Sequence, residues 1–288
     1  MNAGFMWRMF MKMKFEKMHG CGNDYIYVSG FDYDFDAKTK EQLAIKLSDR
    51  HMGIGSDGLI FINPSKIADF EMEMYNADGS RSEMCGNGMR CVSRYVYDHG
   101  LTKNTEFSVE SMGKIKYIQV FLKEGEVDAI RVDMGEPILE PKLIPVDSDK
   151  ERFIDEVINI DGTDLHMTAV SMGNPHTVIF TDPDDVLKFG STVENHSLFP
   201  ERVNAEFVKV LDRNNVRMRV WERGTGETLC CGTGCCATTV ACILNGFTDR
   251  EVTVHVIGGE VKVFWNPEDN HIYMTGPATH VFEGEVEV

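Results

Sequence analysis

Two cysteines, Cys85 and Cys231, open the same short pattern in the two halves of the chain. The pattern is Cys-Gly-polar-Gly, and it reads Cys85-Gly86-Asn87-Gly88 first and Cys231-Gly232-Thr233-Gly234 second. The two cysteines are 146 positions apart in a chain of 288 residues. Two thiols in equivalent positions suit a reaction that uses both faces of one carbon atom. A thiolate would take a proton from one face, and a thiol would give a proton to the other.

Each cysteine runs into a segment with the apolar spacing of a helix, Met89 to Tyr97 and Cys235 to Leu244. A thiol at a helix N-terminus faces unpaired backbone N–H groups and the positive end of the dipole, which lowers its pKa. The glycines let backbone amides approach a ligand closely, and such amides bind a carboxylate well. We therefore expect each motif to hold a carboxylate and to place a sulfur beside its α-carbon.

The other cysteines have simpler interpretations. A free cysteine is usually a small buried hydrophobe, and we assign that role to five of them: Cys91, Cys230, Cys235, Cys236 and Cys242. A zinc site is the alternative for the four cysteines between 230 and 236, but their spacing lacks the Cys-x-x-Cys pairs that usually bind zinc. We predict no metal. Clustering this close also argues against disulfides and for reduced thiols.

The two halves match well beyond the cysteines, which predicts a duplicated domain. Residues 70–75 and 216–221 both alternate like strands, and 109–116 and 255–262 correspond in the same register. Gly100 and Gly246 stand where helix stop signals belong. These patterns predict two similar α+β domains, each mostly strands with one central helix. The unpatterned stretch from Leu139 to Asp164 is the expected connection between them.

Composition excludes several classes of function. The length and a 42% hydrophobic content suit two domains with a large core. A net charge of −17 disfavours nucleic acids and anionic membranes, and we find no apolar run long enough to span a bilayer. Residues 1–12 lack the features of a secretory signal, because Arg8 interrupts the apolar run, and we interpret them as a short extension. Cytoplasm is the expected location.

Several motifs, in this order, resemble the diaminopimelate epimerase family. The resemblance covers nearly everything from Met13 to the C-terminus. Beside the two cysteine motifs, it is carried by Met18-His19-Gly20-Cys21-Gly22-Asn23-Asp24, residues 49–58, Tyr75-Asn76-Ala77-Asp78-Gly79-Ser80, Gly173-Asn174-Pro175-His176, Val203-Asn204-Ala205-Glu206-Phe207 and Glu222-Arg223-Gly224.

The resemblance implies a fold and a reaction. The fold is α+β with two pseudo-symmetric domains, each a mixed, mostly antiparallel β-sheet or barrel around a central helix, with the active site in the cleft between them. We place the first domain at residues 13–131 plus 277–288 and the second at 132–276. The reaction is stereoinversion at one α-carbon of LL-2,6-diaminopimelate to give the meso form, in lysine and peptidoglycan precursor synthesis. The family is independent of pyridoxal phosphate, so no cofactor is expected, and a homodimer is expected.

The resemblance also implies roles for individual residues. Cys85 and Cys231 are the acid and base, and His176 and Glu222 tune their pKa values. Substrate binding is assigned to Asn23, Asn76, Gly86, Asn87, Asn174, Asn204, Glu222, Arg223, Gly232 and Thr233. Among these, the backbone amides would hold the reacting carboxylate, while Arg223 suits the distal carboxylate of the substrate and Glu222 its distal ammonium.

The sequence departs from the family at a few positions, and two rival functions stay open. Cys230 and Cys235 stand where the family usually has small residues, Gly58 where some members have a substrate-contacting Gln, and Phe282 near a Tyr associated with dimer contacts. A proline racemase-like enzyme shares the two-cysteine logic, and Met84-Cys85-Gly86-Asn87-Gly88 is one residue away from its pattern. A thiol-based redox sensor or zinc-binding protein is the rival of a different class.

Overall fold

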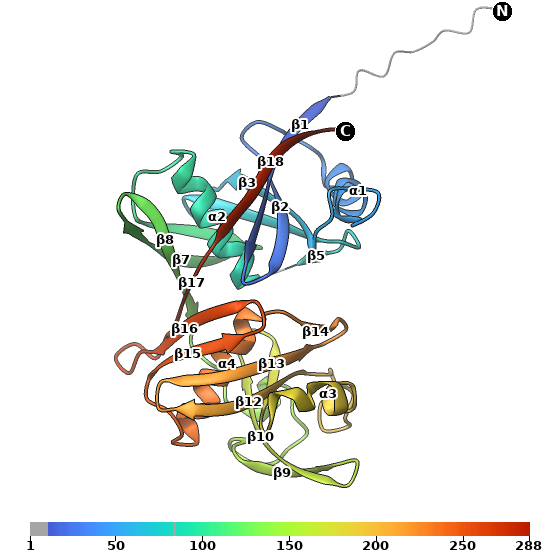
Figure 1. Cartoon of the computed structure of the whole chain (residues 1–288), viewed down its shortest axis with the longest axis vertical. Coiled ribbons are helices and arrows are strands. Elements are labelled where there is room, and N and C mark those ends of the chain that lie inside the picture. Colours follow the sequence, from blue (N-terminus) through green and yellow to red (C-terminus); the bar gives the residue numbers. More distant parts are fainter. Residues whose placement is uncertain (1–10, 83–84) are drawn as a thin grey trace, which may run out of the picture.

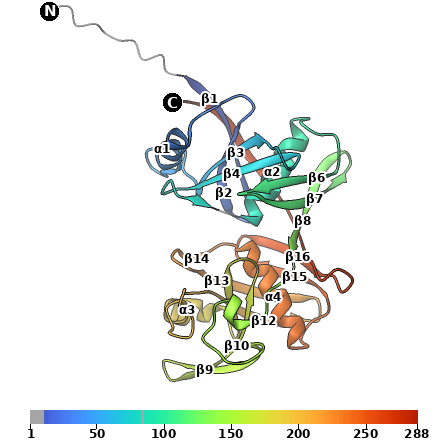
Figure 2. The ribbon, with the colours of Figure 1, turned by 180° about the vertical axis from the view of Figure 1, so that it is seen from behind.

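The chain folds into two lobes that are joined by a pair of strands (Figures 1 and 2). The computed structural model describes residues 11–82 and 85–288. The predicted extension, residues 1–12, therefore lies outside the described residues except for its last two positions. Of these, Lys12 is already the first residue of a strand and pairs with Glu287. No helix in the described part of the chain is long and apolar enough to cross a membrane.

Among the described residues, the first lobe contains eight strands and two helices and includes the C-terminal strand. β18 returns from the second lobe and pairs antiparallel with β1, so the two ends of the described chain lie together (Figure 1). Its elements are β1 (Lys12–Gly20), β2 (Asn23–Ser29), α1 (Ala37–Ser48), β3 (Gly58–Pro64), β4 (Phe70–Asn76), β5 (Arg81–Ser82), α2 (Gly86–Asp98), β6 (Glu106–Ser111), β7 (Lys114–Lys123) and β18 (Thr279–Glu287).

The second lobe repeats this plan. Its elements are η1 (Pro141–Leu143), β9 (Glu156–Ile160), β10 (Thr163–Ser171), β11 (Pro175–Phe180), η2 (Pro183–Asp185), α3 (Val186–Glu194), β12 (Asn204–Asp212), β13 (Asn215–Glu222), β14 (Gly226–Thr228), α4 (Gly232–Leu244), β15 (Glu251–Val256) and β16 (Gly259–Trp265).

Two antiparallel strands, β8 (Glu126–Gly135) and β17 (Ile272–Gly276), join the lobes. The domain boundary predicted at 131/132 falls inside β8, and the one predicted at 276/277 falls at the end of β17. We expected residues 139–164 to be a connection, and this was wrong. The stretch belongs to the second lobe, because it contains η1 and β9 and buries Ile144 and Phe153 in that lobe's core.

Strand pairing confirms the duplication. In the first lobe β2–β3 and β4–β6 are parallel pairs, and β3–β4 and β6–β7 are antiparallel. In the second lobe β11–β12 and β13–β15 are parallel, and β12–β13 and β15–β16 are antiparallel. The registers also match, since Ile60 pairs with Met74 and Glu206 pairs with Val220. Both members of the second pair lie 146 positions after those of the first.

Each lobe wraps its strands around one helix, as the sequence predicts. α2 packs on β8 and β1, and α4 packs on β16 and β10. The main hydrophobic core runs through both lobes, with Val96 from α2 and Val240 from α4 in one cluster. Both helices end at glycines with positive φ, Gly100 at 65° and Gly246 at 72°, which are the predicted stops. The N-termini of α2 and α4 are therefore held in place by equivalent sets of strands in the two lobes.

Candidate active site

The N-termini of α2 and α4 meet between the lobes, with a cysteine capping each. Cys85 has extended backbone angles and accepts a hydrogen bond from the Gly88 amide at 3.2 Å. Cys231 caps α4 in the same way and accepts from the Gly234 amide at 3.4 Å. The helix ends are so close that a Cβ added at Gly232 would lie 3.7 Å from the Cα of Gly86. A Cβ at this distance would be in ordinary van der Waals contact with the opposite backbone, so the two helix starts lie side by side.

A cleft of about 1000 Å³ opens over these two helix ends. Ten of the residues predicted from the sequence line it: Asn23, Asn76, Cys85, Gly86, Asn87, Asn174, Glu222, Cys231, Gly232 and Thr233. Three others are not part of its lining: His176, Asn204 and Arg223. The cleft therefore gathers residues from both halves of the chain, and the first turns of both helices offer their backbone N–H groups at its floor.

Polar neutral groups and a cation surround Cys85. Its thiol donates to Asn23 Oδ1 at 3.1 Å, and the Tyr25 hydroxyl also hydrogen-bonds to it. Arg90 is fully buried behind the first turn of α2, where its guanidinium donates to Asn87 Oδ1 at 2.8 Å and to the Pro277 carbonyl at 3.0 Å. Burial raises the pKa of Cys85, while the Gly88 amide, the Tyr25 hydroxyl and the positive charge of Arg90 act in the opposite direction.

Carboxylates surround Cys231. Burial raises the pKa of its thiol well above the ordinary value, and the negative charges of Glu222 and Glu206 raise it further. The Thr233 hydroxyl lies 3.4 Å from the sulfur and acts in the opposite direction. Glu222 lines the cleft and accepts a hydrogen bond from the Thr228 hydroxyl at 2.5 Å, yet burial raises its pKa as well.

The three predicted residues outside the lining stand behind it. His176 is fully buried and contacts Asn174 Oδ1 through Nε2 at 3.0 Å. Asn204 is buried, donates to the Pro175 carbonyl at 3.0 Å and accepts from the backbone amide of Arg223 at 2.8 Å. The Arg223 guanidinium donates to the Glu201 carbonyl at 3.0 Å. In this structure Asn204 and His176 hold other residues in place rather than facing the cleft.

Sequence reasoning did not assign a role to several residues of the site. Arg50 and Asp57 line the cleft, where Arg50 Nη2 donates to Asp57 Oδ1 at 2.8 Å and Asn23 donates to Asp57 Oδ2 at 2.7 Å. Burial raises the pKa of Asp57. Glu206 lies in the Val203–Phe207 motif, and a Glu inside an apolar strand is itself a signal, because a buried carboxylate needs a partner.

Comparison with known proteins identifies the family. The model of the family described as diaminopimelate epimerase matches residues 15–140 and 168–281. A protein of Agathobacter rectalis named diaminopimelate epimerase is 55% identical over 286 residues, which cover 96% of this chain and 100% of that one. A protein of the same name from Methanococcus maripaludis is 48% identical, again over 96% and 100%.

The chain belongs to the diaminopimelate epimerase family. It is thus an isomerase that acts on an amino acid. The fold also resembles that of more distant proteins. A phenazine biosynthesis protein of the PhzF family from Bacillus anthracis superposes with a TM-score of 0.70 at 18% identity, over 96% and 100% of the two chains. A hydroxyproline epimerase from Agrobacterium vitis gives 0.65 at 14%, over 96% and 91%. At such identities the likeness shows the fold alone.

Among the remaining thiols of this family member, Cys230 also lines the cleft. All eight cysteines are within the described residues, and all are free thiols. Cys21 comes from the turn between β1 and β2 and hydrogen-bonds to Cys230, which also hydrogen-bonds to Cys235. Within residues 11–82 and 85–288, no group of three or more His, Cys, Asp or Glu is placed to hold a metal ion.

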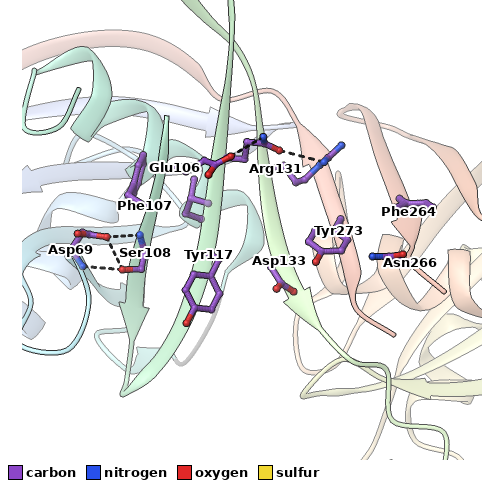
Figure 3. A pocket seen from close by; sticks show the side chains of 12 residues that line it. Asp69, Glu106, Phe107, Ser108, Tyr117, Arg131, Asp133, Phe264, Asn266 and Tyr273 are labelled. Carbon is purple, nitrogen blue, oxygen red and sulfur yellow. Dashed lines mark hydrogen bonds between the residues drawn. The ribbon is translucent and has the colours of Figure 1, made fainter. Parts of the chain in front are cut away.

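A second cavity, of about 710 Å³, lies over the strands that join the lobes (Figure 3). Its walls come from β6, β7 and β8 on one side and from Phe264, Asn266 and Tyr273 on the other. The Arg131 guanidinium lies 5.9 Å from the centre of the Tyr273 ring and donates to Gln119. No cysteine lines this cavity, so the candidate active site of this epimerase family member is the cleft at α2 and α4.

Proposed function

We propose that this enzyme converts LL-2,6-diaminopimelate into meso-diaminopimelate by acid–base catalysis with Cys85 and Cys231, without a cofactor. The observation that carries the proposal is the convergence of two cysteine-capped helix N-termini on one cleft. Membership of the family supports the substrate. Products of this kind supply lysine and peptidoglycan synthesis, and the proposal includes that use.

The proposed chemistry begins with the carboxylate next to the reacting carbon. The backbone amides of Gly86, Asn87, Gly232 and Thr233 bind it at the two positive helix ends. One cysteine thiolate removes the α-proton, and the charge that develops is spread onto the bound carboxylate. The other cysteine, as a thiol, protonates the same carbon from the opposite face. The sulfurs thereby exchange states, so the pair holds one proton before and after each turnover.

The far end of the substrate explains the remaining polar groups of the cleft. This end carries an ammonium and a carboxylate. A substrate without these two groups would leave the polar groups of the cleft unpaired, and the site would reject it. Asn23, Asn76 and Asn174 line the cleft and offer amide groups, and Glu222 offers a negative charge to the ammonium. Arg223 remains our candidate for the distal carboxylate, and Asn204 would act on it by holding the Arg223 backbone.

The oligomeric state and the location are also proposals. We propose a homodimer and a cytoplasmic protein with reduced thiols. Support for a protein contact at the C-terminal strand comes from Val281 and Phe282, which are 51% and 44% exposed on β18. Exposed apolar side chains on a strand at the surface are available for a protein contact.

Proton NMR in D2O tests the proposal. Purified, reduced, metal-free enzyme is mixed with LL-diaminopimelate without added cofactor. The expected result is deuterium at an α-carbon together with the appearance of the meso isomer. Heat-inactivated enzyme is the control for non-enzymatic exchange.

Two other results would reject the proposal. Exchange with proline and none with diaminopimelate would assign the chain to a proline racemase-like activity. Exchange with neither, together with stoichiometric zinc in the isolated protein, would favour a binding or sensor role.

A further inference from the structure

The two cysteines occupy equivalent positions, but the residue packed against each helix start differs in kind. Ile60 on β3 and Glu206 on β12 are 146 positions apart and have the same register in their sheets. A Cβ added at Gly88 would lie 2.9 Å from Ile60 Cδ1, and a Cβ added at Gly234 would lie 2.8 Å from Glu206 Oε1. The same place beside the capping sulfur thus holds a methyl group in one lobe and a carboxylate oxygen in the other.

Glu206 and His176 form a fully buried pair. His176 Nδ1 lies 2.7 Å from Glu206 Oε1, and neither side chain is exposed. His176 Nε2 lies 3.0 Å from Asn174 Oδ1, so both ring nitrogens have a partner. Glu206 Oε2 has no hydrogen-bond partner in the part of the chain that the structure describes. A buried carboxylate oxygen without a partner is costly, which points to a function.

The charged and titratable groups around the two sulfurs differ: two carboxylates act on Cys231, whereas the charge that acts on Cys85 is the cation of Arg90. Around Cys231 they are Glu206 from β12, Glu222 from β13, His176 from β11 and Cys235 from α4 itself. Around Cys85 they are Tyr25 from β2, with Asp57 beyond it, and Arg90 and Cys91 from α2. The position equivalent to Arg90 in α4 is Cys236, so the second helix has no cation there.

We propose that Glu206, held by His176, is a positioning residue that keeps the proton of the resting cysteine pair on Cys231, so that Cys85 loses its proton first. The carboxylate is the member of the Glu206–His176 pair that lies against the first turn of α4. Its negative charge opposes a second negative charge on the neighbouring sulfur, and burial makes this effect strong. Ile60 exerts no such effect on Cys85. The role in turnover rests on the proposed function, whereas the difference between the two thiols does not.

Alkylation of the free enzyme tests the proposal without any substrate. Iodoacetamide, which is uncharged, reacts with thiolates, so the pH dependence of its rate at each cysteine reports that cysteine's protonation. Peptide mass spectrometry distinguishes the reaction at Cys85 from that at Cys231. The pH midpoint of each cysteine in a variant is compared with that of the same cysteine in the wild-type enzyme, so differences in access between the two cysteines do not matter. In the wild-type enzyme we expect Cys85 to react at lower pH than Cys231. In Glu206→Gln we expect the Cys231 midpoint to fall by about one pH unit while that of Cys85 stays in place.

Activity gives the second readout. In Glu206→Gln the high-pH limb of kcat/KM should move to lower pH, because it reports loss of the proton from the remaining thiol. Glu73→Gln is the matched control, because it removes another buried carboxylate, one that is paired with Lys40 and is not part of the cleft lining. It should leave both cysteine midpoints unchanged.

Each result either supports or overturns the proposed role of Glu206. An unchanged Cys231 midpoint in folded Glu206→Gln would overturn the proposal, as would an equal shift in Glu73→Gln. If Glu206→Gln does not fold, Glu206→Asp is measured in the same way. Its side chain is one methylene shorter, so the carboxylate lies farther from the sulfur, and the Cys231 midpoint should fall by a smaller amount. Absence of turnover in the wild-type enzyme would reject the proposed function, and the alkylation midpoints would still test the role of Glu206.

Discussion

The first and second lobes present the same thiol on the same helix cap, but different charged groups act on it. Cys85 lies near the Tyr25 hydroxyl and the buried Arg90, whereas Cys231 lies among Glu206 and Glu222. A duplicated backbone supplies the two-fold geometry that a reaction at two faces of one carbon requires. Unequal side chains at equivalent positions then make one shared proton possible, because two identical sulfurs would not favour either protonation state.

The backbone features that the lobes share are those that we propose bind the carboxylate. Both helices begin directly after the cysteine, and both have glycines in the first turn. Met274 on β17 packs against both helix ends, since Cβ atoms added at Gly86 and at Gly232 would lie 2.7 Å from its Cε and 3.3 Å from its Sδ. The anion site is therefore symmetric, while the acid–base groups around it are not.

The largest effect should come from removing either sulfur. We expect Cys85→Ala and Cys231→Ala each to lower kcat by about 10²- to 10⁴-fold, because general acid–base groups contribute on that scale. Cys242→Ala, in the buried part of α4 and outside the cleft lining, is the control and should retain activity. Circular dichroism would check the fold. Wild-type turnover in either Cys85→Ala or Cys231→Ala would contradict the proposed mechanism with two thiols.

A smaller effect should separate the glycines in the first turns. In Gly234→Ala the new Cβ would meet Glu206 Oε1 at 2.8 Å, and this oxygen is held by His176. In Gly88→Ala it would meet Ile60 Cδ1 at 2.9 Å, the terminal methyl of an apolar side chain that carries no hydrogen bond. We expect kcat/KM to fall about 10- to 100-fold in Gly234→Ala, since small displacements of catalytic groups are costly.

The matched variant makes this prediction specific. Gly88→Ala should stay within about threefold of the wild-type kcat/KM, because alanine also favours the helix by about 1 kcal/mol. Steady-state kinetics of both variants at one pH would measure the difference. Equal losses in the two variants would show that crowding of the helix starts, and not the position of Glu206, limits activity.

The sequence predicted the parts of the fold that are periodic or repeated. Strands 70–75 and 216–221, both central helices and their glycine stops follow from local patterns, and the structure confirms them. The stretch 139–164 was misassigned because β9 is short and pairs with β10, and so its stability comes from a partner strand rather than from its own pattern. Tertiary pairing of this kind leaves little trace in a single segment.

The site was predicted in its lining but not in its supporting layer. Ten assigned residues line the cleft because motif residues at turns and helix starts tend to face ligands. Asn204 has the same residue type and motif context, yet it lies beneath the surface and holds the Arg223 backbone. The role of Glu206 needed the spatial equivalence with Ile60. Only the register of β3 and β12 makes that comparison visible.

The smallest predicted effect concerns acid stability, in which the lobes should differ. In the first lobe, burial alone would raise the pKa of Asp24, but hydrogen bonds from Arg50 and Lys17 outweigh it and hold that pKa below its usual value. Such a carboxylate contributes stability above its unfolded pKa, and the contribution is lost as the pH falls through the folded pKa. In the second lobe, burial raises the pKa values of Glu206 and Glu222. These groups destabilise the fold when charged, and protonation relieves this as the pH falls.

Amide hydrogen exchange, corrected for the pH dependence of the intrinsic rate, would measure the two lobes separately. Between neutral pH and about pH 4 the second lobe should keep or gain protection, and below about pH 4 the first lobe should lose it first. The part of the Asp24 contribution that comes from Arg50 should be no more than about 1 kcal/mol, because Arg50 is 55% exposed and its ion pair is screened, whereas the pair with Lys17 is buried. Asp24→Asn should remove part of the first lobe's acid response and leave the second unchanged. Loss of protection in both lobes at one pH would instead mean that the shared core, with Val96 and Val240 in one cluster, makes them unfold as a single unit.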